Sequence, residues 1–179
     1  MKKLSRKELL KKYDSVSLFS EGLAVAIKDN KQFHIYSDGT PAYKERYNSV
    51  GFFSKGLAWV NKDDKQFHIR SNGTPAYEER YDFVGSFSEG LAWVDKDGKQ
   101  FHIHPNGTPA YKERYDSVGP FLEGLAVVKK NGEYFHIHPD STPAYKERYD
   151  SVSFFSEGLA WVVKDGKGFN IRPDGTRVD

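Results

Sequence analysis

Residues 87–111 read Phe-Ser-Glu-Gly-Leu-Ala-Trp-Val-Asp-Lys-Asp-Gly-Lys-Gln-Phe-His-Ile-His-Pro-Asn-Gly-Thr-Pro-Ala-Tyr, and close copies of this stretch recur every 34 residues. Self-similarity at a fixed period is typical of repeat architectures, in which each unit leaves an apolar face that only its neighbours can cover. The sequence therefore predicts five repeats, which begin at Tyr13, Tyr47, Tyr81, Tyr115 and Tyr149.

Each repeat contains two tight-turn signals. Lys96–Lys99 and Pro105–Thr108 both supply a glycine where a turn needs positive φ. The runs beside these turns are rich in Val, Ile, Phe, Trp and Tyr, which suit a pleated, packed surface. The predicted strands of this repeat are residues 91–94, 100–103 and 109–111, with a short lead-in strand near residues 82–87. The pattern predicts an all-β chain of antiparallel β-meander repeats.

The N-terminus is predicted to differ from the repeats. We expect a basic leader at residues 1–12 and a single five-repeat β domain at residues 13–179. Within the leader, Leu4 to Lys12 behind Ser5 predicts a short capped helix. Counting back one period from Tyr43 reaches Leu9, so residues 7–12 take the place of a Pro-Ala-Tyr-Lys-Glu-Arg segment, which the fifth repeat lacks. A ring would need one such element from the other terminus, which favours a small five-bladed β-propeller; an open β-hairpin stack is the alternative.

Composition and charge limit the function classes. The chain is globular in composition, with 37% hydrophobic and 15% aromatic residues, and it contains no cysteine for disulfides or thiolate-zinc sites. No apolar run approaches the roughly 20 residues that span a bilayer, so a cytoplasmic location is expected. The formal net charge is +2, of which residues 1–12 carry six basic charges and one acidic, leaving −3 for the repeats. An acidic repeat body is a poor match for phosphate backbones, so we expect neither nucleic acid nor membrane as a partner.

The fifth repeat carries the clearest family signature. It contains Phe-Ser-Glu-Gly-Leu-Ala-Trp-Val at 155–162, Asp-Gly-Lys at 165–167, Phe-Asn-Ile at 169–171 and Pro-Asp-Gly at 173–175. This pattern resembles the bacterial WG (KWG) β-repeat family over residues 13–179. The Trp-Gly pair that names the family is Gln32-Phe33 in the first repeat, and only Gly168-Phe169 keeps the glycine. The resemblance implies a β-rich repeat module that mediates binding, and it transfers no catalytic residue.

One histidine position recurs in four repeats. His34, His68, His102 and His136 are equivalent, with Asn170 in the fifth repeat. If they met on the axis of a ring, they could hold a metal or an anion. The favoured interpretation is that each lies in the middle of a strand, central in its sheet, and bonds neighbouring backbone or an acid. We therefore predict no metal and no cofactor.

Repeated aromatic positions are the candidate ligand-binding residues. They are Tyr43, Tyr77, Tyr111, Tyr145, Trp59, Trp93 and Trp161. The tryptophans alternate with Val25 and Val127, a pattern that also suits packing between repeats. The turn at Ser20–Gly22 and its equivalents is a second expected contact surface. Its Glu21 is predicted to be a solvated turn residue, and Arg46 with Glu45 to form ion pairs between repeats or an exposed edge.

The sequence predicts a non-enzymatic repeat module for protein binding or scaffolding. Catalysis needs one asymmetric constellation, whereas the carboxylates here recur at equal spacing. The alternative is a glycan-binding lectin with one site per repeat, built from an aromatic face and a carboxylate. We expect an unidentified protein partner, or a carbohydrate in the alternative, and a monomeric chain.

Overall fold

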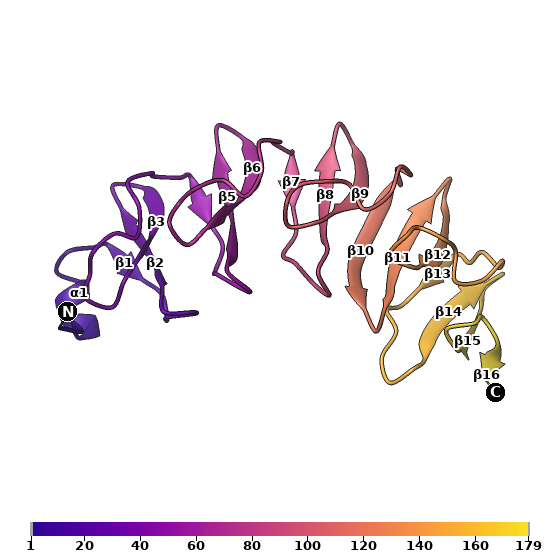
Figure 1. Cartoon of the computed structure of the whole chain (residues 1–179). Coiled ribbons are helices and arrows are strands. Elements are labelled where there is room, and N and C mark those ends of the chain that lie inside the picture. The colour runs from indigo at the N-terminus through magenta and orange to yellow at the C-terminus, as the bar shows by residue number, and fades with distance from the viewer. Residues whose placement is uncertain (1, 179) are drawn as a thin grey trace. The chain divides into compact units, whose positions relative to one another are not determined.

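The computed structural model describes residues 2–178, and their regular structure consists of short antiparallel strands and one short helix (Figure 1). The chain divides into two compact units, Met1–Ser86 and Phe87–Asp179, which are described separately. No helix within residues 2–178 has the length and apolar character needed to cross a membrane. The prediction of a single domain over residues 13–179 stays a prediction.

The first unit contains α1 and strands β1 to β7. Their bounds are α1 Arg6–Leu9, β1 Ser15–Val16, β2 Ala24–Lys28, β3 Lys31–Ile35, β4 Ser49–Val50, β5 Leu57–Lys62, β6 Lys65–Arg70 and β7 Phe83–Val84. Two antiparallel sheets have the orders β1-β2-β3 and β4-β5-β6.

The second unit contains strands β8 to β16. Their bounds are β8 Ala92–Lys96, β9 Lys99–Ile103, β10 Ser117–Leu122, β11 Leu125–Lys130, β12 Glu133–Ile137, β13 Ser151–Val152, β14 Ala160–Lys164, β15 Lys167–Ile171 and β16 Arg177–Val178. β8 and β9 pair as a hairpin, and two further antiparallel sheets have the orders β10-β11-β12 and β13-β14-β15-β16. The predicted antiparallel meander repeats are confirmed.

The position of the strands within a repeat differs from the prediction in one respect. The Leu-Ala-x-Val strand is central, as β2 is between β1 and β3, so the Phe-His-Ile strand is not the central one. The predicted Pro-Ala-Tyr strand is reduced to an isolated bridge, such as Ile35↔Pro41. Proline has no N–H for a ladder, so pairing there depends on the next residue, where Ala42 N–H donates to the His34 carbonyl over 2.9 Å.

The apolar core follows from strand alternation. Ala24 and Ala26 on β2 are fully buried, as are Val60 on β5 and Ile35 on β3. The hairpin turns use left-handed residues at both central positions, for example Asp29 at φ 52° and Asn30 at φ 58°. Positive φ at both central positions is typical of the two-residue hairpin turn whose twist matches that of the flanking strands.

Within each unit, the tyrosine of one repeat packs on a glycine turn of the next. A Cβ at Gly73 would lie 2.6 Å from Cγ of Tyr43, and one at Gly175 would lie 2.9 Å from Cγ of Tyr145. At the first repeat, Leu9 of α1 takes the tyrosine's place, with its Cδ2 3.0 Å from a Cβ at Gly39. Leu9 is 2% exposed, so the register drawn from the sequence between Leu9 and Tyr43 is confirmed.

The helix forms where its cap was predicted. The Ser5 hydroxyl accepts from the Glu8 N–H over 3.3 Å, and the Glu8 carboxylate accepts from the Ser5 N–H over 2.8 Å. This reciprocal capping box satisfies backbone donors that a single helical turn would leave unpaired. The hydrogen bond from Leu4 N–H to the Ser37 carbonyl, 2.8 Å long, ties the leader to the first repeat.

Because Tyr43 packs on the Gly73 turn, we expect two glycine substitutions to lower the free energy of unfolding by different amounts. Gly73→Ala places a methyl group against the Tyr43 ring at φ +84°, whereas Gly22→Ala meets no atom within 4 Å at φ +80°. Both variants carry the left-handed penalty of about 1 kcal/mol, and Gly73→Ala should lose about 1–3 kcal/mol more through overpacking. Urea denaturation measures the difference, and equal losses would contradict the proposed contact.

Candidate functional site

The repeated histidine joins each repeat to the next. His34 Nδ1 lies 2.5 Å from the hydroxyl of Tyr43, in its own repeat, and its Nε2 lies 2.9 Å from the carbonyl oxygen of Gly51, in the next. A carbonyl can only accept, so Nε2 carries the hydrogen and Nδ1 accepts from the tyrosine hydroxyl. The same bridge joins three further sets: His68, Tyr77 and Gly85; His102, Tyr111 and Gly119; His136, Tyr145 and Ser153.

Burial holds these histidines in the neutral form. Their side chains are at most 1% exposed, and desolvation lowers the pKa of His34, His68, His102 and His136 to about 4. Both ring nitrogens are used in hydrogen bonds within the fold. Within residues 2–178 no group of three or more His, Cys, Asp or Glu side chains could hold a metal ion. The favoured interpretation of a histidine bonded to neighbouring backbone agrees with this geometry.

The candidate tyrosines lie inside the molecule. Tyr43, Tyr77, Tyr111 and Tyr145 are 6–7% exposed, and burial raises the pKa of each. Their hydroxyls are the partners of the histidines, and the rings of Tyr43 and Tyr145 cover the turns at Gly73 and Gly175. They therefore act as packing residues, and the lectin alternative has no open aromatic face at these positions.

The candidate tryptophans lie nearer the surface. Trp59 and Trp93 are half-buried, and Trp161 is 51% exposed. The ring of Trp59 lies against Gly51, where a Cβ would come within 2.5 Å of Cδ1, and the ring of Trp161 lies against Gly168. Glycine at these two positions gives the indole rings room to lie against the backbone.

Exposed apolar residues accompany the tryptophans, and sequence reasoning missed them. Phe52 is 59% exposed, next to Gly51, and Phe154 is 45% exposed, next to Ser153, whose N–H donates to the Trp161 carbonyl. We call the pairs Phe52 with Trp59 and Phe154 with Trp161 the aromatic corners. The doublets Phe52-Phe53 and Phe154-Phe155 were the available signal, since one phenylalanine of each must face outward while its neighbour is buried.

A second missed feature is a groove beside a stacked arginine. Arg46 Cζ lies 3.6 Å from the ring centre of Phe33, and its Nη1 donates to the carbonyls of Tyr43, Lys44 and Glu45 over 2.9–3.1 Å. Of the two alternatives for Arg46 and Glu45, the exposed edge agrees with the structure: both residues are exposed, and Nη1 bonds the carbonyls of its own loop. The stacked arginine recurs in three pairs: Arg80 on Phe67, Arg114 on Phe101, and Arg148 on Phe135.

Three equivalent grooves open beside these arginines. The first-repeat groove has a volume of about 280 Å³, with buried Phe33 and Tyr13 at its floor and Arg46, Lys28 and Lys31 at its walls. The second-repeat groove, beside Arg80, measures about 410 Å³, and the fourth-repeat groove, beside Arg148, about 300 Å³.

The glutamates that precede the repeated Gly-Leu-Ala make contacts between repeats. The Glu21 carboxylate accepts from Lys55 N–H over 2.6 Å and from Gly56 N–H over 2.9 Å, one repeat further on. Glu123 binds Glu157 N–H and Gly158 N–H in the same way. Glu21 and Glu123 are exposed turn residues, as predicted, and the structure adds that each carboxylate bonds the backbone of the next repeat. Because their carboxylates hold the next turn, they are poor candidates for binding a partner.

The fold and these contacts define an all-β repeat protein. The chain resembles solved β-propellers: Hsv2 of Kluyveromyces lactis (11% identity, 89% of this chain and 61% of that one, TM-score 0.52), Hsv2 of Kluyveromyces marxianus (12%, 91% and 60%, 0.55) and a eukaryotic initiation factor (12%, 92% and 53%, 0.58). At these identities the likeness concerns the fold alone, and the chain spans little more than half to three fifths of their length.

The sequence itself gives the family. The model of the WG containing repeat matches residues 5–31, 38–65, 69–99, 103–134 and 147–167. The chain therefore belongs to the WG repeat family, as its resemblance implied. No curated protein matches it.

The neutral histidines predict loss of stability in mild acid. The unfolded chain takes up protons below pH 6.5, whereas the folded histidines stay neutral to about pH 4, so their contribution is complete above pH 6.5 and falls as the pH drops through this window. Each buried histidine contributes up to about 3 kcal/mol to the free energy of unfolding at neutral pH, and this contribution is lost in acid. Urea denaturation from pH 7 to 5 should show that the free energy of unfolding falls with a slope approaching four protons, one for each buried histidine. A slope of one proton or less would contradict the assignment.

The histidine bridge also predicts the effect of removing one hydroxyl. Tyr111→Phe leaves Nδ1 of buried His102 without its partner at 2.6 Å. We expect a loss of about 1–3 kcal/mol in the free energy of unfolding, measured by chemical denaturation. Tyr36→Phe, at a residue that is 44% exposed, is the matched control and should change stability little. Similar losses for both variants would contradict the bridge.

Proposed function

We propose that this chain is a non-enzymatic protein-binding module whose partner packs on the aromatic corners. The observation that carries the proposal is the exposure of large apolar side chains, with Phe52 at 59%, Trp161 at 51% and Phe154 at 45%. Exposed phenylalanine and tryptophan offer large apolar area with few rotatable bonds, which favours protein contacts. The propeller-like repeat fold suits a scaffold that holds such residues rigidly.

Fixed backbone around the corners supports this role. The Gly51 N–H donates to the Trp59 carbonyl over 2.8 Å, so Phe52 leaves a strand that is tied to its neighbour. In the fifth repeat, the Ser153 hydroxyl accepts from Trp161 N–H over 2.9 Å, which fixes the base of Phe154. A surface that is already ordered loses little conformational entropy when a partner binds.

The use of the histidines supports a role without catalysis. Each bridging imidazole has both nitrogens in hydrogen bonds within the fold, and its lowered pKa makes it a weak base. A cytoplasmic location fits a chain that requires no disulfide for stability, since it has no cysteine.

Photo-crosslinking in the cell tests the proposed surface. Benzoylphenylalanine placed at position 52 or position 161 should give a discrete crosslinked protein, because each side chain is exposed at its own aromatic corner. The control is position 36, where Tyr36 is 44% exposed outside the corners. Equal crosslinking at all three positions, or none at 52 and 161, would contradict the proposal.

A double substitution measures the energy of the contact. Phe52→Ser with Trp161→Ser removes exposed apolar area and leaves the buried core in place. For a partner identified by crosslinking, we expect the dissociation constant to rise at least tenfold, since buried aromatic contacts at an interface contribute about 1–2 kcal/mol or more. Unchanged affinity would show that the corners are not the binding surface.

A further inference from the structure

The three equivalent grooves differ in charge although they share one architecture. The first-repeat groove has Lys28, Lys31 and Arg46 against the single carboxylate of Asp29, a net charge of +2. The second-repeat groove has three cations against two carboxylates, a net charge of +1. In the fourth-repeat groove two cations meet two carboxylates, one of them Glu133 in place of lysine.

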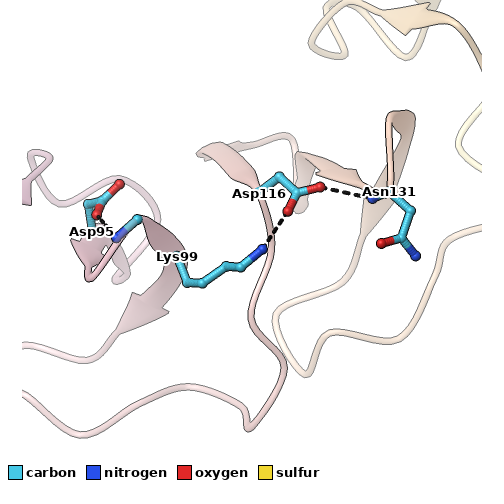
Figure 2. Close-up of polar contacts among 5 residues, drawn as sticks. Asp95, Lys99, Asp116 and Asn131 are labelled. Atoms are coloured by element: carbon cyan, nitrogen blue, oxygen red, sulfur yellow. Dashed lines mark hydrogen bonds and ion pairs between the residues drawn. The ribbon is translucent and has the colours of Figure 1, made fainter.

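The lysine of the first-repeat groove also lacks a charge partner that its equivalents have. Lys65 Nζ is paired with Asp82 at 2.5 Å, and Lys99 Nζ with Asp116 at 2.7 Å. Figure 2 shows Asp116 between Lys99 and the turn residue Asn131. The Asp116 carboxylate also accepts a hydrogen bond from the Asn131 N–H over 2.8 Å. Lys31 instead reaches the neutral amide oxygen of Asn48, at 2.6 Å, so its positive charge is not neutralised.

The guanidinium of Arg46 is fixed in position at this groove, and some of its N–H donors have no partner among the described residues. Only Nη1 of Arg46 bonds its loop, and the guanidinium is fixed flat over Phe33. Nη2 and Nε form no hydrogen bond with the described residues, so donors suited to a carboxylate are left over. At the floor, Tyr13 packs edge-on to Phe33 with ring centres 5.7 Å apart, and its hydroxyl donates to the Gly39 carbonyl.

We propose that the first-repeat groove binds a carboxylate side chain of an acidic peptide segment. Arg46, Lys28 and Lys31 supply the positive charge, and exposed Pro41 beside them offers an apolar contact for the aliphatic part of a glutamate or for its neighbour. This groove shares no residue with the aromatic corners, so the proposal does not depend on the function proposed above.

The probe is a fluorescent poly-glutamate peptide, compared with a poly-glutamine peptide of the same length. Anisotropy with the full chain at low ionic strength should show binding of poly-glutamate alone, weakened by added salt. Lys28→Gln with Lys31→Gln should weaken it roughly tenfold, since each exposed charge contributes on the order of threefold. Thermal unfolding of each variant confirms that the fold is intact.

Two further variants separate this groove from general attraction. Lys62→Gln with Lys65→Gln removes the same charge from the second-repeat groove and should leave affinity nearly unchanged. Asn48→Asp gives Lys31 the carboxylate partner that Lys65 has, and should weaken binding roughly threefold. Equal losses for the two double variants, or no effect of Asn48→Asp, would overturn the proposal.

A change of ligand class would also overturn it. A phosphoserine peptide that binds more tightly than poly-glutamate would assign the groove to phosphate in place of carboxylate. An oligonucleotide that competes better than either peptide would assign it to nucleic acid. Preference for poly-glutamate over both, lost in Lys28→Gln with Lys31→Gln, is the result expected.

Discussion

The fold depends on neutral histidines that hydrogen-bond across the boundary between repeats. His34 connects the Tyr43 hydroxyl of its own repeat to the Gly51 carbonyl of the next, while Tyr43 covers the Gly73 turn. A single 34-residue repeat would leave this imidazole and this ring without their partners. An unpaired buried polar group destabilises a protein by more free energy than a hydrogen bond contributes. Consecutive repeats must therefore become ordered together.

The departure from the family's Trp-Gly pair has a physical reason at this boundary. The Gln32 side chain accepts from Val50 N–H over 3.1 Å, and Gln66 accepts from Val84 N–H over 3.0 Å. An indole could not accept these bonds. In the fifth repeat, Gly168 instead makes room for the Trp161 ring. The chain thus exchanges an aromatic residue for a hydrogen-bond acceptor between repeats.

The period predicted the repeat number, the strands and the register of Leu9, because these depend on spacing and on local turn chemistry. The period did not predict which groups a side chain contacts, because those contacts depend on the tertiary fold. Nothing in the sequence tells an arginine that stacks on Phe33 from one that pairs with Glu45, and both outcomes leave it exposed. The tyrosines are candidates for ligand binding in the sequence, and not packing residues, for the same reason: the hydrogen bond from Tyr43 to His34 spans a turn, and spacing alone does not predict it.

Positions that are identical in the repeats hold the scaffold, so specific binding belongs where the repeats differ. The histidine, its tyrosine and the stacked arginine are built into successive repeats and buried or bonded within them. By contrast, Phe52 aligns with Ser86 and Pro120, and Asn48 aligns with Asp82 and Asp116. A change that the scaffold does not require alters only the surface: it exposes a ring in the first case and frees the charge of Lys31 in the second. Two different surfaces can therefore be added to one repeated frame without disturbing the bonds that hold it together.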